Sequence, residues 1–295
     1  MNNKIVLITG ATGGIGKQTA ISLGKVGATV VITGRNKESG EKAVAEIKLQ
    51  SGNPNIELLT ADLSAKTGIS DLVSQFNARF DTLDVLINNA GSAAHERKLN
   101  KEGVEVNFAV NVLAPYLLTT LLLDPLKMSS SGRVITLMGG DLPKNLDLDN
   151  LQNKKSIVGL SYYSQTKLTM MALMYEYAQR LKGTGVTVNI CYPGQASTSM
   201  TQSVTPQMLP GIMKILYPLF KLLVRPDGGK SAAKASRSSV YLATSVDVEK
   251  LGGIYVDKNL KISRMPKVVT DEYNRKFIWD YVNNLILTRN DHPEL

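Results

Sequence analysis

The chain has 295 residues, a hydrophobic content of 43% and a formal net charge of +9. This composition allows a sizeable buried core, and the basic residues are scattered rather than grouped in blocks, which argues against a nucleic-acid-binding protein. One cysteine, Cys191, excludes an internal disulfide framework, and with only two histidines beside it a zinc or other metal site is not expected.

An apolar strand begins at Lys4, which leaves no room for a signal peptide. No apolar run reaches the ~18 residues that a membrane-spanning helix needs. The single cysteine also suits a reducing compartment. We therefore expect a cytoplasmic protein with no transmembrane segment, and peripheral contact with a membrane stays open.

Short apolar runs alternate with longer amphipathic runs along the chain. The apolar runs predict strands at 4–8, 28–33, 56–60, 84–88, 133–138, 186–191 and 253–256. The amphipathic runs predict helices at 15–26, 37–50, 67–79, 103–127, 163–182 and 228–243. This alternation predicts an α/β fold, a Rossmann-type doubly wound parallel sheet of about seven strands with helices on both faces. Since no break in composition divides the chain, we expect a single domain over residues 1–295.

A glycine-rich run follows the first strand and leads directly into the first helix. Glycines let a turn approach a pyrophosphate closely, and the N-terminus of the helix offers free N–H groups to the anion. In this strand–turn–helix setting, the run predicts a dinucleotide site rather than a plain tight turn. The residues expected to hold the cofactor here are Gly10, Thr12, Gly13, Gly14, Ile15 and Gly16.

The end of the second strand carries Arg35, where a site for NAD(H) usually has an acid for the ribose 2′-hydroxyl. A guanidinium forms bidentate hydrogen bonds with a phosphate. Arg35 and the following Asn36 therefore favour NADP(H) over NAD(H). The alternative is a surface arginine at the start of a helix.

A tyrosine and a lysine lie four residues apart, at Tyr163 and Lys167, and the run that follows has helical periodicity. On a helix the two side chains share a face, so the ammonium can lower the pKa of the phenol from its ordinary value of about 10. Such a tyrosine can give a proton to an oxygen during a reduction or take one during an oxidation. The spacing also fits an exposed pair on a solvated helix, and it is the glycine-rich turn that favours an active site.

Taken together, the motifs of the chain resemble those of the short-chain dehydrogenase/reductases, in that family's order over roughly residues 5–200. The motifs are Thr9-Gly10-x-x-x-Gly14-x-Gly16, Ala61-Asp62-Leu63, Asn88-Asn89-Ala90-Gly91, Asn111, Tyr163-x-x-x-Lys167 and Pro193-Gly194-x-x-x-Thr198. Further stretches resemble the family's retinol dehydrogenase-like branch. They are Gly14–Lys17, Gly34–Asn36, Val110–Leu113, Leu117–Thr119, Tyr163–Leu168 and Gly183–Val188.

The resemblance implies an NADP(H)-dependent oxidoreductase with Tyr163, Lys167 and Asn111 in catalysis. Lys167 would bond the nicotinamide ribose and lower the pKa of Tyr163, and Asn111 would hold a water behind Lys167. The further cofactor residues that it implies are Asp62 and Leu63 at the adenine, Asn88, Asn89, Ala90 and Gly91 at the nicotinamide side and the central strand, and Pro193, Gly194 and Thr198 over the carboxamide.

The chain departs from the family pattern after the fifth strand, where a serine would bond the substrate oxygen beside the tyrosine. Gly139 falls on that position. Losing one such donor costs about 10²–10³ in rate. If that loss handicaps a ketone substrate, Gly139→Ser is expected to raise ketone reduction by up to about 10²-fold. If the site is made for a bond that needs no donor there, the same change should leave the native reaction flat or slower, because the added side chain narrows the pocket. Another hydroxyl could reach in, Ser161 and Tyr162 being the nearest in sequence, or the substrate could supply its own donor. The reaction could instead reduce a C=C or C=N bond, or the protein could be an NADP(H)-binding protein with weakened catalysis.

Residues from about 198 to 228 form an apolar, methionine-rich run interrupted by prolines, and the resemblance implies that this segment is a lid over the substrate. Methionine adapts to irregular ligand shapes, so we expect a lipophilic small molecule. The run also fits a dimer contact, and hence a homo-oligomer, or an interfacial membrane helix assisted by its basic residues. Residues from about 258 to 295 would be a C-terminal extension. The residues expected to contact the substrate are Gly139, Met138, Asp141, Gln195 and Met200.

Overall fold

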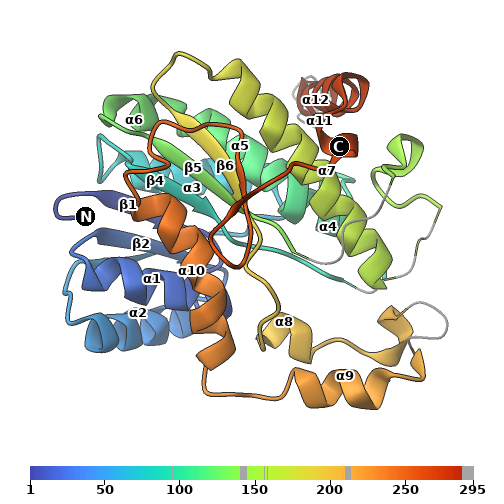
Figure 1. Ribbon diagram of the computed structural model, residues 1–295, viewed down its shortest axis with the longest axis horizontal. Helices are drawn as coiled ribbons and strands as arrows, with labels where there is room; N and C mark the ends of the chain where they lie inside the picture. Colours follow the sequence, from blue (N-terminus) through green and yellow to red (C-terminus); the bar gives the residue numbers. More distant parts are fainter. Residues whose placement is uncertain (95, 140–144, 156, 158, 210–213, 288–295) are drawn as a thin grey trace.

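The computed structural model describes residues 1–94, 96–139, 145–155, 157, 159–209 and 214–287 (Figure 1). Its centre is an eight-stranded sheet in the order β3-β2-β1-β4-β5-β6-β7-β8. The strands are β1 (Ile5–Ile8), β2 (Thr29–Gly34), β3 (Ile56–Thr60), β4 (Val85–Asn88), β5 (Arg133–Leu137), β6 (Thr187–Cys191), β7 (Tyr255–Val256) and β8 (Ile262–Ser263). All neighbouring strands are parallel except β7 and β8, which are antiparallel. The predicted α/β fold is confirmed, and β8 is a strand that the alternation did not predict.

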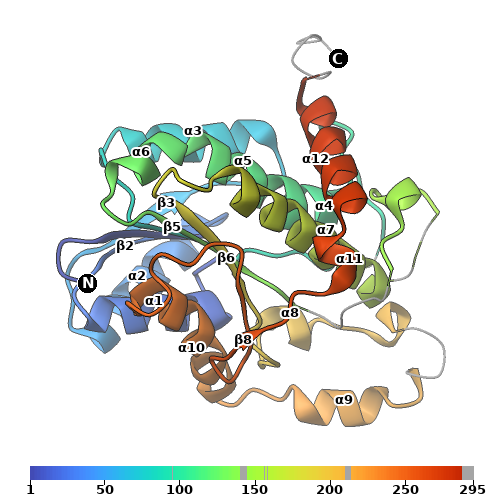
Figure 2. The same ribbon diagram turned by 45° about the horizontal axis from the view of Figure 1, so that its top comes forward.

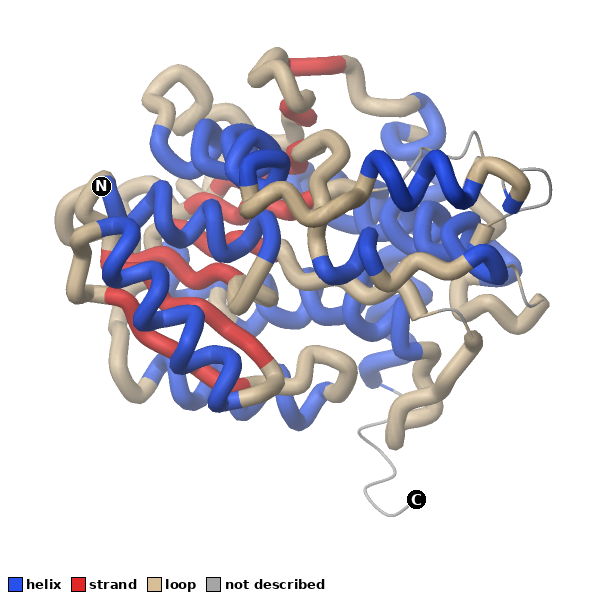
Figure 3. The backbone as a smooth tube through the Cα atoms, turned by 90° about the horizontal axis from the view of Figure 1, so that it is seen from below, coloured by secondary structure: helices blue, strands red, loops and turns tan. Residues whose placement is uncertain are grey.

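The side chains of the strands alternate between two buried cores, one on each face of the sheet. In β1, Val6 and Ile8 belong to one core and Leu7 to the other. The first core is covered by α1 (Gly14–Lys25), α2 (Lys37–Ser51) and α10 (Lys230–Thr244). The second is covered by α3 (Lys66–Asn77), α5 (Ala114–Leu121), α7 (Gly159–Arg180) and α12 (Glu272–Leu287). Figures 1 and 3 show the strands between these two layers of helices. Burial on both faces explains why the strands read as nearly continuous apolar runs.

Strand β1 pairs with β2 on one side and with β4 on the other, so the sheet is wound outward in both directions from β1. The crevice beyond the carboxyl ends of β1 and β4 is therefore a topological switch point. Open α/β sheets bind their ligands at such points. This position is where the predicted cofactor residues after β1 and β4 would meet.

The predicted single helix at 103–127 is wrong. The structure has α4 (Val106–Phe108), a π-helical turn η1 (Ala109–Leu113), α5, and α6 (Leu123–Met128). Pro115 has no N–H to bond the carbonyl of Asn111, and Pro125 has none for the carbonyl of Leu121, so the α-helical ladder is interrupted at both places. The first interruption puts Asn111 in the π turn, a feature that is frequent at functional sites.

The second half of the chain contains short elements that the periodicity did not predict. They are η2 (Leu148–Asn150), α8 (Ser199–Gln202), η3 (Pro206–Met208), α9 (Tyr217–Leu223) and α11 (Lys267–Thr270). Residues 210–213 of the predicted lid lie outside the described part of the chain. Within the described part, none of the helices combines the length and the apolar character that crossing a bilayer requires.

Helix α12 is fastened to α7 by an aromatic cluster and by buried charges. The ring of Trp279 makes edge contacts with Tyr116 and Tyr177, at centroid distances of 5.2 and 5.3 Å. The guanidinium of Arg180 lies 4.1 Å from the Trp279 ring. Glu176, buried on α7, pairs with Arg180 and with Arg275, which precedes Trp279 by one turn of α12. Helices α11 and α12 therefore pack on the body of the protein, with α12 over the helix that carries Tyr163.

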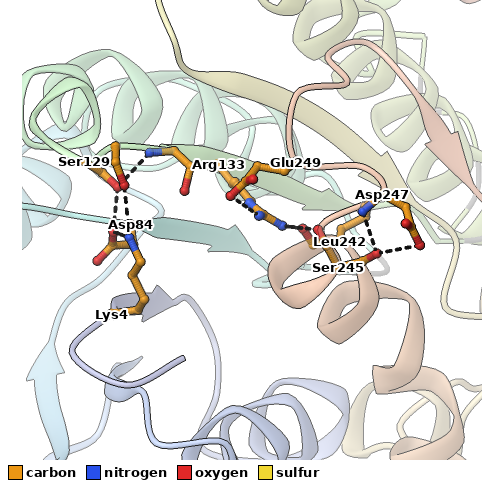
Figure 4. Close-up of polar contacts among 10 residues, drawn as sticks. Lys4, Asp84, Ser129, Arg133, Leu242, Ser245, Asp247 and Glu249 are labelled. Carbon is orange, nitrogen blue, oxygen red and sulfur yellow. Dashed lines mark hydrogen bonds and ion pairs between the residues drawn. The ribbon is translucent and has the colours of Figure 1, made fainter.

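The amino ends of the central strands are joined by two buried charged residues (Figure 4). Asp84, just before β4, accepts hydrogen bonds from the Lys4 ammonium at 2.8 Å, the Ile5 N–H at 2.8 Å and the Ser129 hydroxyl. Arg133, the first residue of β5, donates to the Leu242 carbonyl at 3.0 Å and pairs with Glu249 at 2.9 Å. Because strands run from this edge to the switch point, these contacts hold the sheet at the end opposite to the predicted site.

Candidate functional site

The glycine-rich turn between β1 and α1 touches two segments that are distant in sequence. Gly10 and Gly14 have φ values of 61° and 55°, a left-handed backbone that favours glycine. A Cβ atom on Gly10 would lie 2.9 Å from the Cα atom of Ala90, and one on Gly14 would lie 3.0 Å from the Thr198 Cγ2 atom. Three predicted motifs, after β1, β4 and β6, are thus brought together.

Asn89 and Thr9 fix this turn to the end of β4. The Asn89 Nδ2 group donates to the carbonyls of Thr9 and Gly10, at 2.8 and 2.9 Å. The N–H groups of Asn89 and Ala90 both donate to the Thr9 hydroxyl at 3.0 Å. The side chain of Asn89 was predicted to contact the cofactor; in the structure its amide group holds the glycine-rich turn. Thr9 has the same role, and the motif reading did not single out its hydroxyl.

At the start of α1, Gly16 packs so tightly that a Cβ atom would lie 2.5 Å from Asn89 Nδ2, whereas Gly13 would meet nothing within 4 Å. Thr12 contacts the end of β2, where a Cβ on Gly34 would lie 2.4 Å from its Cγ2 atom. Ile15 packs at the edge of the core below α1. The turn therefore has a packed side toward the protein and an open side at Gly13, as a cradle for a pyrophosphate requires.

A cavity of about 600 Å³ lies beyond the ends of β2 and β3 and is lined by both Arg35 and Asp62. Asp62 is exposed, and one oxygen of its carboxylate accepts from the N–H and hydroxyl of Ser64, at 3.0 and 2.8 Å. Asn36 caps α2 by accepting from the Ser39 N–H, so its side chain serves the helix. Leu63 is buried in the core, and only its backbone remains to meet a ligand.

Tyr163 and Lys167 lie one turn apart on α7, with the Lys167 Nζ atom 6.0 Å from the centre of the Tyr163 ring. Lys167 is 4% exposed, and its ammonium donates to the Leu137 carbonyl at the end of β5, at 3.1 Å. Burial lowers the pKa of Lys167 to about 8. Burial also raises the pKa of Tyr163 to about 12, with a smaller contribution from Tyr192. In the protein alone the pKa of the phenol is thus raised, because desolvation of the phenolate is the larger effect. Its lowering by Lys167 together with a cofactor cation stays a prediction.

Asn111, in the π turn, is fully buried and joins α7 to the loop after β4. Its Nδ2 group donates to the Ser92 carbonyl at 2.8 Å and to the Thr166 hydroxyl at 2.9 Å, and its Oδ1 atom accepts from the Ser92 N–H. A Cβ atom on Gly91 would lie 3.5 Å from Asn111 Oδ1 and 3.7 Å from Lys167 Nζ. The glycine thus leaves a small polar space between these two groups, at the place where the resemblance implies a water.

The segment after β6 reaches across this space. Pro193 is buried and Gly194 has a φ of 80°. Thr198 caps α8 through a reciprocal capping box with Thr201. The Met200 Cε atom lies 3.3 Å from the position of a Cβ on Gly91, so Met200 covers the polar space, whereas Gln195 is exposed to solvent.

These arrangements agree with sequence comparison. A sequence model of the short chain dehydrogenase family matches residues 4–209. The chain belongs to the short-chain dehydrogenase family. It is an oxidoreductase of that family, in the retinol dehydrogenase-like branch.

Relatives of this short-chain dehydrogenase extend over nearly its whole length. Retinol dehydrogenase 13 of Mus musculus is 33% identical over 280 residues, covering 94% of this chain and 81% of the relative. Polyprenol dehydrogenase of Homo sapiens is 32% identical over 285 residues, covering 94% and 83%.

Solved structures show the same fold. An uncharacterized protein from Mycobacterium paratuberculosis superposes with a TM-score of 0.75 at 24% identity, covering 96% of this chain and 93% of that one. The RhlG/NADP complex of Pseudomonas aeruginosa gives a TM-score of 0.64 at 22% identity, covering 87% and 95%. That neighbour is described as a complex with NADP.

In this short-chain dehydrogenase, Gly139 lies directly beside the Tyr163 hydroxyl, since a Cβ atom on Gly139 would be only 2.5 Å from that oxygen. Neither candidate replacement for the missing serine fits. Ser161 faces solvent. The Tyr162 hydroxyl is buried, 2.9 Å from both the Glu105 carboxylate and the Leu151 carbonyl. Met138, predicted to contact the substrate, belongs to the core instead, and Asp141 lies outside the described residues.

Other groups at this short-chain dehydrogenase site were not found from the sequence. They are the Ser92 backbone and the Thr166 hydroxyl, which hold Asn111, the Leu137 carbonyl, which holds Lys167, and Tyr192, whose charge would oppose that of Tyr163. Main-chain partners leave no signal in a sequence. Cys191, at the end of β6, is buried in the core as predicted. Among the described residues there is no group of three His, Cys, Asp or Glu side chains placed to hold a metal ion.

Proposed function

We propose that the protein is an NADP(H)-dependent oxidoreductase acting on a lipophilic alcohol or carbonyl compound, with the Tyr163 hydroxyl as its acid–base group. The observation that carries the proposal is the convergence of the glycine-rich turn, Lys167 and Tyr163 around the small space beside Gly91. The nicotinamide would supply or accept the hydride. The protein's own residues would bind the cofactor, orient the substrate and move the proton.

The turn and the Arg35 cavity support NADP(H) as the cofactor. A side chain at Gly13 would meet nothing within 4 Å, whereas Gly10 and Gly16 of the same turn are packed too closely for a side chain. Arg35 is exposed and, among the described residues, has no carboxylate partner in an ion pair. It is therefore free to bind a 2′-phosphate in two hydrogen bonds, while Asp62 would meet the adenine across the same cavity.

The ionisation of Tyr163 and Lys167 favours reduction as the direction. With a pKa of about 12, the phenol keeps its proton at neutral pH and can donate it to a substrate oxygen. Lys167, with a pKa of about 8, is mainly charged at pH 7 and can bond the nicotinamide ribose. The cationic ring of an oxidised nicotinamide would lower the pKa of Tyr163 and make the reverse transfer easier.

The segment after β6 supports a lipophilic substrate. Met200 covers Gly91, and beyond it Val204, Met208 and Leu209 form an apolar cluster. An apolar wall with a flexible methionine suits a large apolar molecule. The names of two relatives, retinol dehydrogenase and polyprenol dehydrogenase, indicate substrates of that kind.

One observation favours a second candidate, the reduction of a C=C or C=N bond. Among the described residues, no side-chain donor beside Gly139 accompanies Tyr163: Ser161 is exposed to solvent, and the Tyr162 hydroxyl bonds Glu105. A developing oxyanion would have a single hydroxyl donor there, which weakens ketone reduction by about 10²–10³.

The test is NADPH oxidation by the purified protein with matched lipophilic ketones, enones and imines. Tyr163→Phe is expected to lose turnover by about 10²–10⁴-fold and to keep the affinity for NADPH, because the phenol moves a proton. Turnover of enones alone would favour the second candidate. NADPH binding without turnover of any substrate, or a Tyr163→Phe variant as active as the wild type, would contradict the proposal.

A further inference from the structure

Helix α9 is apolar on two sides, and only one of them is packed. On the inner side, Tyr217 and Phe220 contact the apolar cluster of the segment after β6. On the outer side, Leu219 and Leu222 of α9 and the capping residue Leu216 just before it are 51–55% exposed, and Ile215, one residue earlier, is 76% exposed. The three leucines are spaced three residues apart and therefore share a side of the helix. We call Ile215, Leu216, Leu219 and Leu222 the apolar stripe.

Among the residues that the structure describes, none covers the apolar stripe. In Figures 1 and 2, α9 lies at the outer rim of the molecule, with α8 between it and the sheet, and Figure 3 looks at the molecule from that side. A helix that is hydrophobic all round is normally buried in a protein or in a membrane. Large aliphatic side chains gathered at one exposed place mark a contact with another surface.

The surroundings of the apolar stripe are basic. Residues 198–230 contain four basic residues and a single acid, Asp227. Lys214 and Arg225 flank the stripe and are exposed, and Lys221 bonds the Gln202 carbonyl with its charge above the Tyr217 ring. Asp227 accepts hydrogen bonds from the Gly229 and Ser231 N–H groups, so its charge caps α10. The whole chain carries a net charge of +9 as well.

We propose that α9 docks on an anionic lipid surface, with the apolar stripe in the boundary between headgroups and acyl chains and Lys214 and Arg225 among the headgroups. An amphipathic element with large apolar side chains and a basic border binds a bilayer in this manner. A second copy of the chain fits less well, because two basic borders would be brought together. The inference rests on the surface of α9 and holds whichever reaction the site performs.

Docking would also set the position of the site. Helix α9 packs on the cluster of Val204, Met208 and Leu209, and the same segment carries Met200 over Gly91. A bilayer under α9 would therefore lie next to the apolar approach to Tyr163. A substrate dissolved in the bilayer would enter without crossing water.

The experiment is sedimentation of the full chain with vesicles of equal parts phosphatidylcholine and phosphatidylserine, and with vesicles of phosphatidylcholine alone. The apolar variant is Leu216→Ser/Leu219→Ser/Leu222→Ser, and its matched control is Leu49→Ser/Val246→Ser, which removes exposed apolar side chains far from α9. The charge variant is Lys214→Glu/Arg225→Glu, matched by Lys25→Glu/Lys48→Glu on exposed lysines of α1 and α2. Circular dichroism verifies that each variant is folded.

The wild type is expected to bind the anionic vesicles at low salt and to be released as salt rises. The apolar variant should bind at least about tenfold more weakly, given the apolar area withdrawn from the bilayer. The charge variant should lose about fivefold or more for each residue changed. Both controls should bind like the wild type.

Three results would overturn the proposal. One is a wild type that does not bind the anionic vesicles. Another is an apolar variant, folded, that binds as tightly as the wild type. The third is a dimer in solution that the same leucine substitutions convert to a monomer, since the apolar stripe would then be a contact between copies.

Discussion

Gly139 determines how the Tyr163 hydroxyl sits, because any Cβ atom at that position would be 2.5 Å from the oxygen. The sequence left two outcomes of a serine there open, a restored donor for ketones or a narrowed pocket that slows the native reaction. The structure adds that a serine must displace the phenol before it can help. The position is therefore a packing constraint on the reacting group as well as a missing donor.

Gly139→Ala and Gly139→Ser separate these two effects, because alanine adds the Cβ atom without the hydroxyl. We expect Gly139→Ala to lower turnover by about tenfold or more on every substrate, since even a small misplacement of a catalytic group is costly. Gly139→Ser should exceed Gly139→Ala by up to about 10²-fold on ketones and should equal it on enones. Steady-state kinetics on both classes is the measurement, and an alanine variant as fast as the wild type would contradict the close contact.

Arg35 carries the predicted preference for NADP(H). Charge-assisted hydrogen bonds contribute about 1.5–3 kcal/mol, so Arg35→Asp should weaken NADPH binding by roughly 10–100-fold and improve the binding of NADH. Fluorescence titration with both cofactors measures this. Lys48→Asp, on an exposed lysine at the end of α2, is the matched control. Equal affinities of the wild type for the two cofactors would rule out the role given to Arg35.

Lys167 is expected to lower the free energy of unfolding, because its ammonium is buried at the proposed site. Its pKa falls from 10.5 to about 8 on folding, so the folded state disfavours the ammonium below that pH. Between about 8 and 10.5 the unfolded chain holds the extra proton, and the free energy of unfolding should therefore rise with pH.

Lys167→Met should accordingly unfold with about 2 kcal/mol more free energy than the wild type at pH 7, once the lost bond to the Leu137 carbonyl is allowed for. The difference should shrink as the pH rises toward 10.5, while activity is lost at every pH. Urea unfolding at several pH values is the measurement. A variant less stable than the wild type at pH 7 would show that the buried ammonium is compensated.

At the scale of elements, α12 stabilises α7 through side chains that a local pattern does not reveal. Trp279→Ala should cost about 2–4 kcal/mol, because the ring fills the space between Tyr116, Tyr177 and the Arg180 guanidinium. Tyr273→Ala, at a position near the start of α12 that is 69% exposed, should cost less than about 0.5 kcal/mol. Urea unfolding compares the two, and equal losses would mean that α12 is not anchored at Trp279.

The elements that the sequence predicted well are those whose pattern is local. The strands β1 to β6 read as apolar runs because most of their residues are buried between the helix layers. Helices α1 and α2 follow from amphipathic runs, and Asn36 caps α2. The two-residue strand β8 is too short for a period, and the helix at 103–127 was drawn through Pro115 and Pro125. The aromatic side of α12 packs on α7, which is distant in sequence. A local pattern therefore could not show what Trp279 contacts.

At the scale of the molecule, the two ends of the central strands have different roles, one in the candidate site and the other in stability. The carboxyl ends of the strands form the site, and Asp84 joins β1, β4 and the turn before β5 at the opposite edge. Burial pushes the pKa of Asp84 up, but the hydrogen bonds from Lys4, Ser129 and the Ile5 N–H outweigh it, and the net pKa is lowered. Its contribution to stability is therefore present above its ordinary pKa of 3.8 and is lost as the pH falls through the lower, folded value.

Asp84→Asn should lower the free energy of unfolding by about 1–3 kcal/mol at pH 7 and leave cofactor binding unchanged. The gap from the wild type should close as the pH falls below 3.8. Asp247→Asn, an exposed aspartate at the same edge, is the control and should change stability by less than about 0.5 kcal/mol. A gap that stays constant with pH would show that the carboxylate charge is not the cause.

The sequence predicted which segments meet at the candidate site, but not the detailed geometry of their side chains. Parallel strands end at one edge, so Gly10, Ala90 and Thr198 could be expected to meet although they are far apart in sequence. The pKa values of Lys167 and Tyr163 could not be predicted from the spacing of the pair, because burial by the whole fold is the main cause of both shifts. The contact between Gly139 and Tyr163 also depends on how β5 and α7 lie against each other.

The packing of α12 also has a consequence for the order in which the protein is made. Ile278 and Val282 share a buried cluster with Leu7 of the first strand, so one core is closed by residues from opposite parts of the chain. A ribosome delivers the first strand, the glycine-rich turn and the Tyr163 helix well before α12 emerges. Until then the outer side of that helix, with Tyr177, and the neighbouring Tyr116 of α5 stay uncovered. The nascent chain therefore has a period in which chaperones can bind a surface that the finished protein conceals.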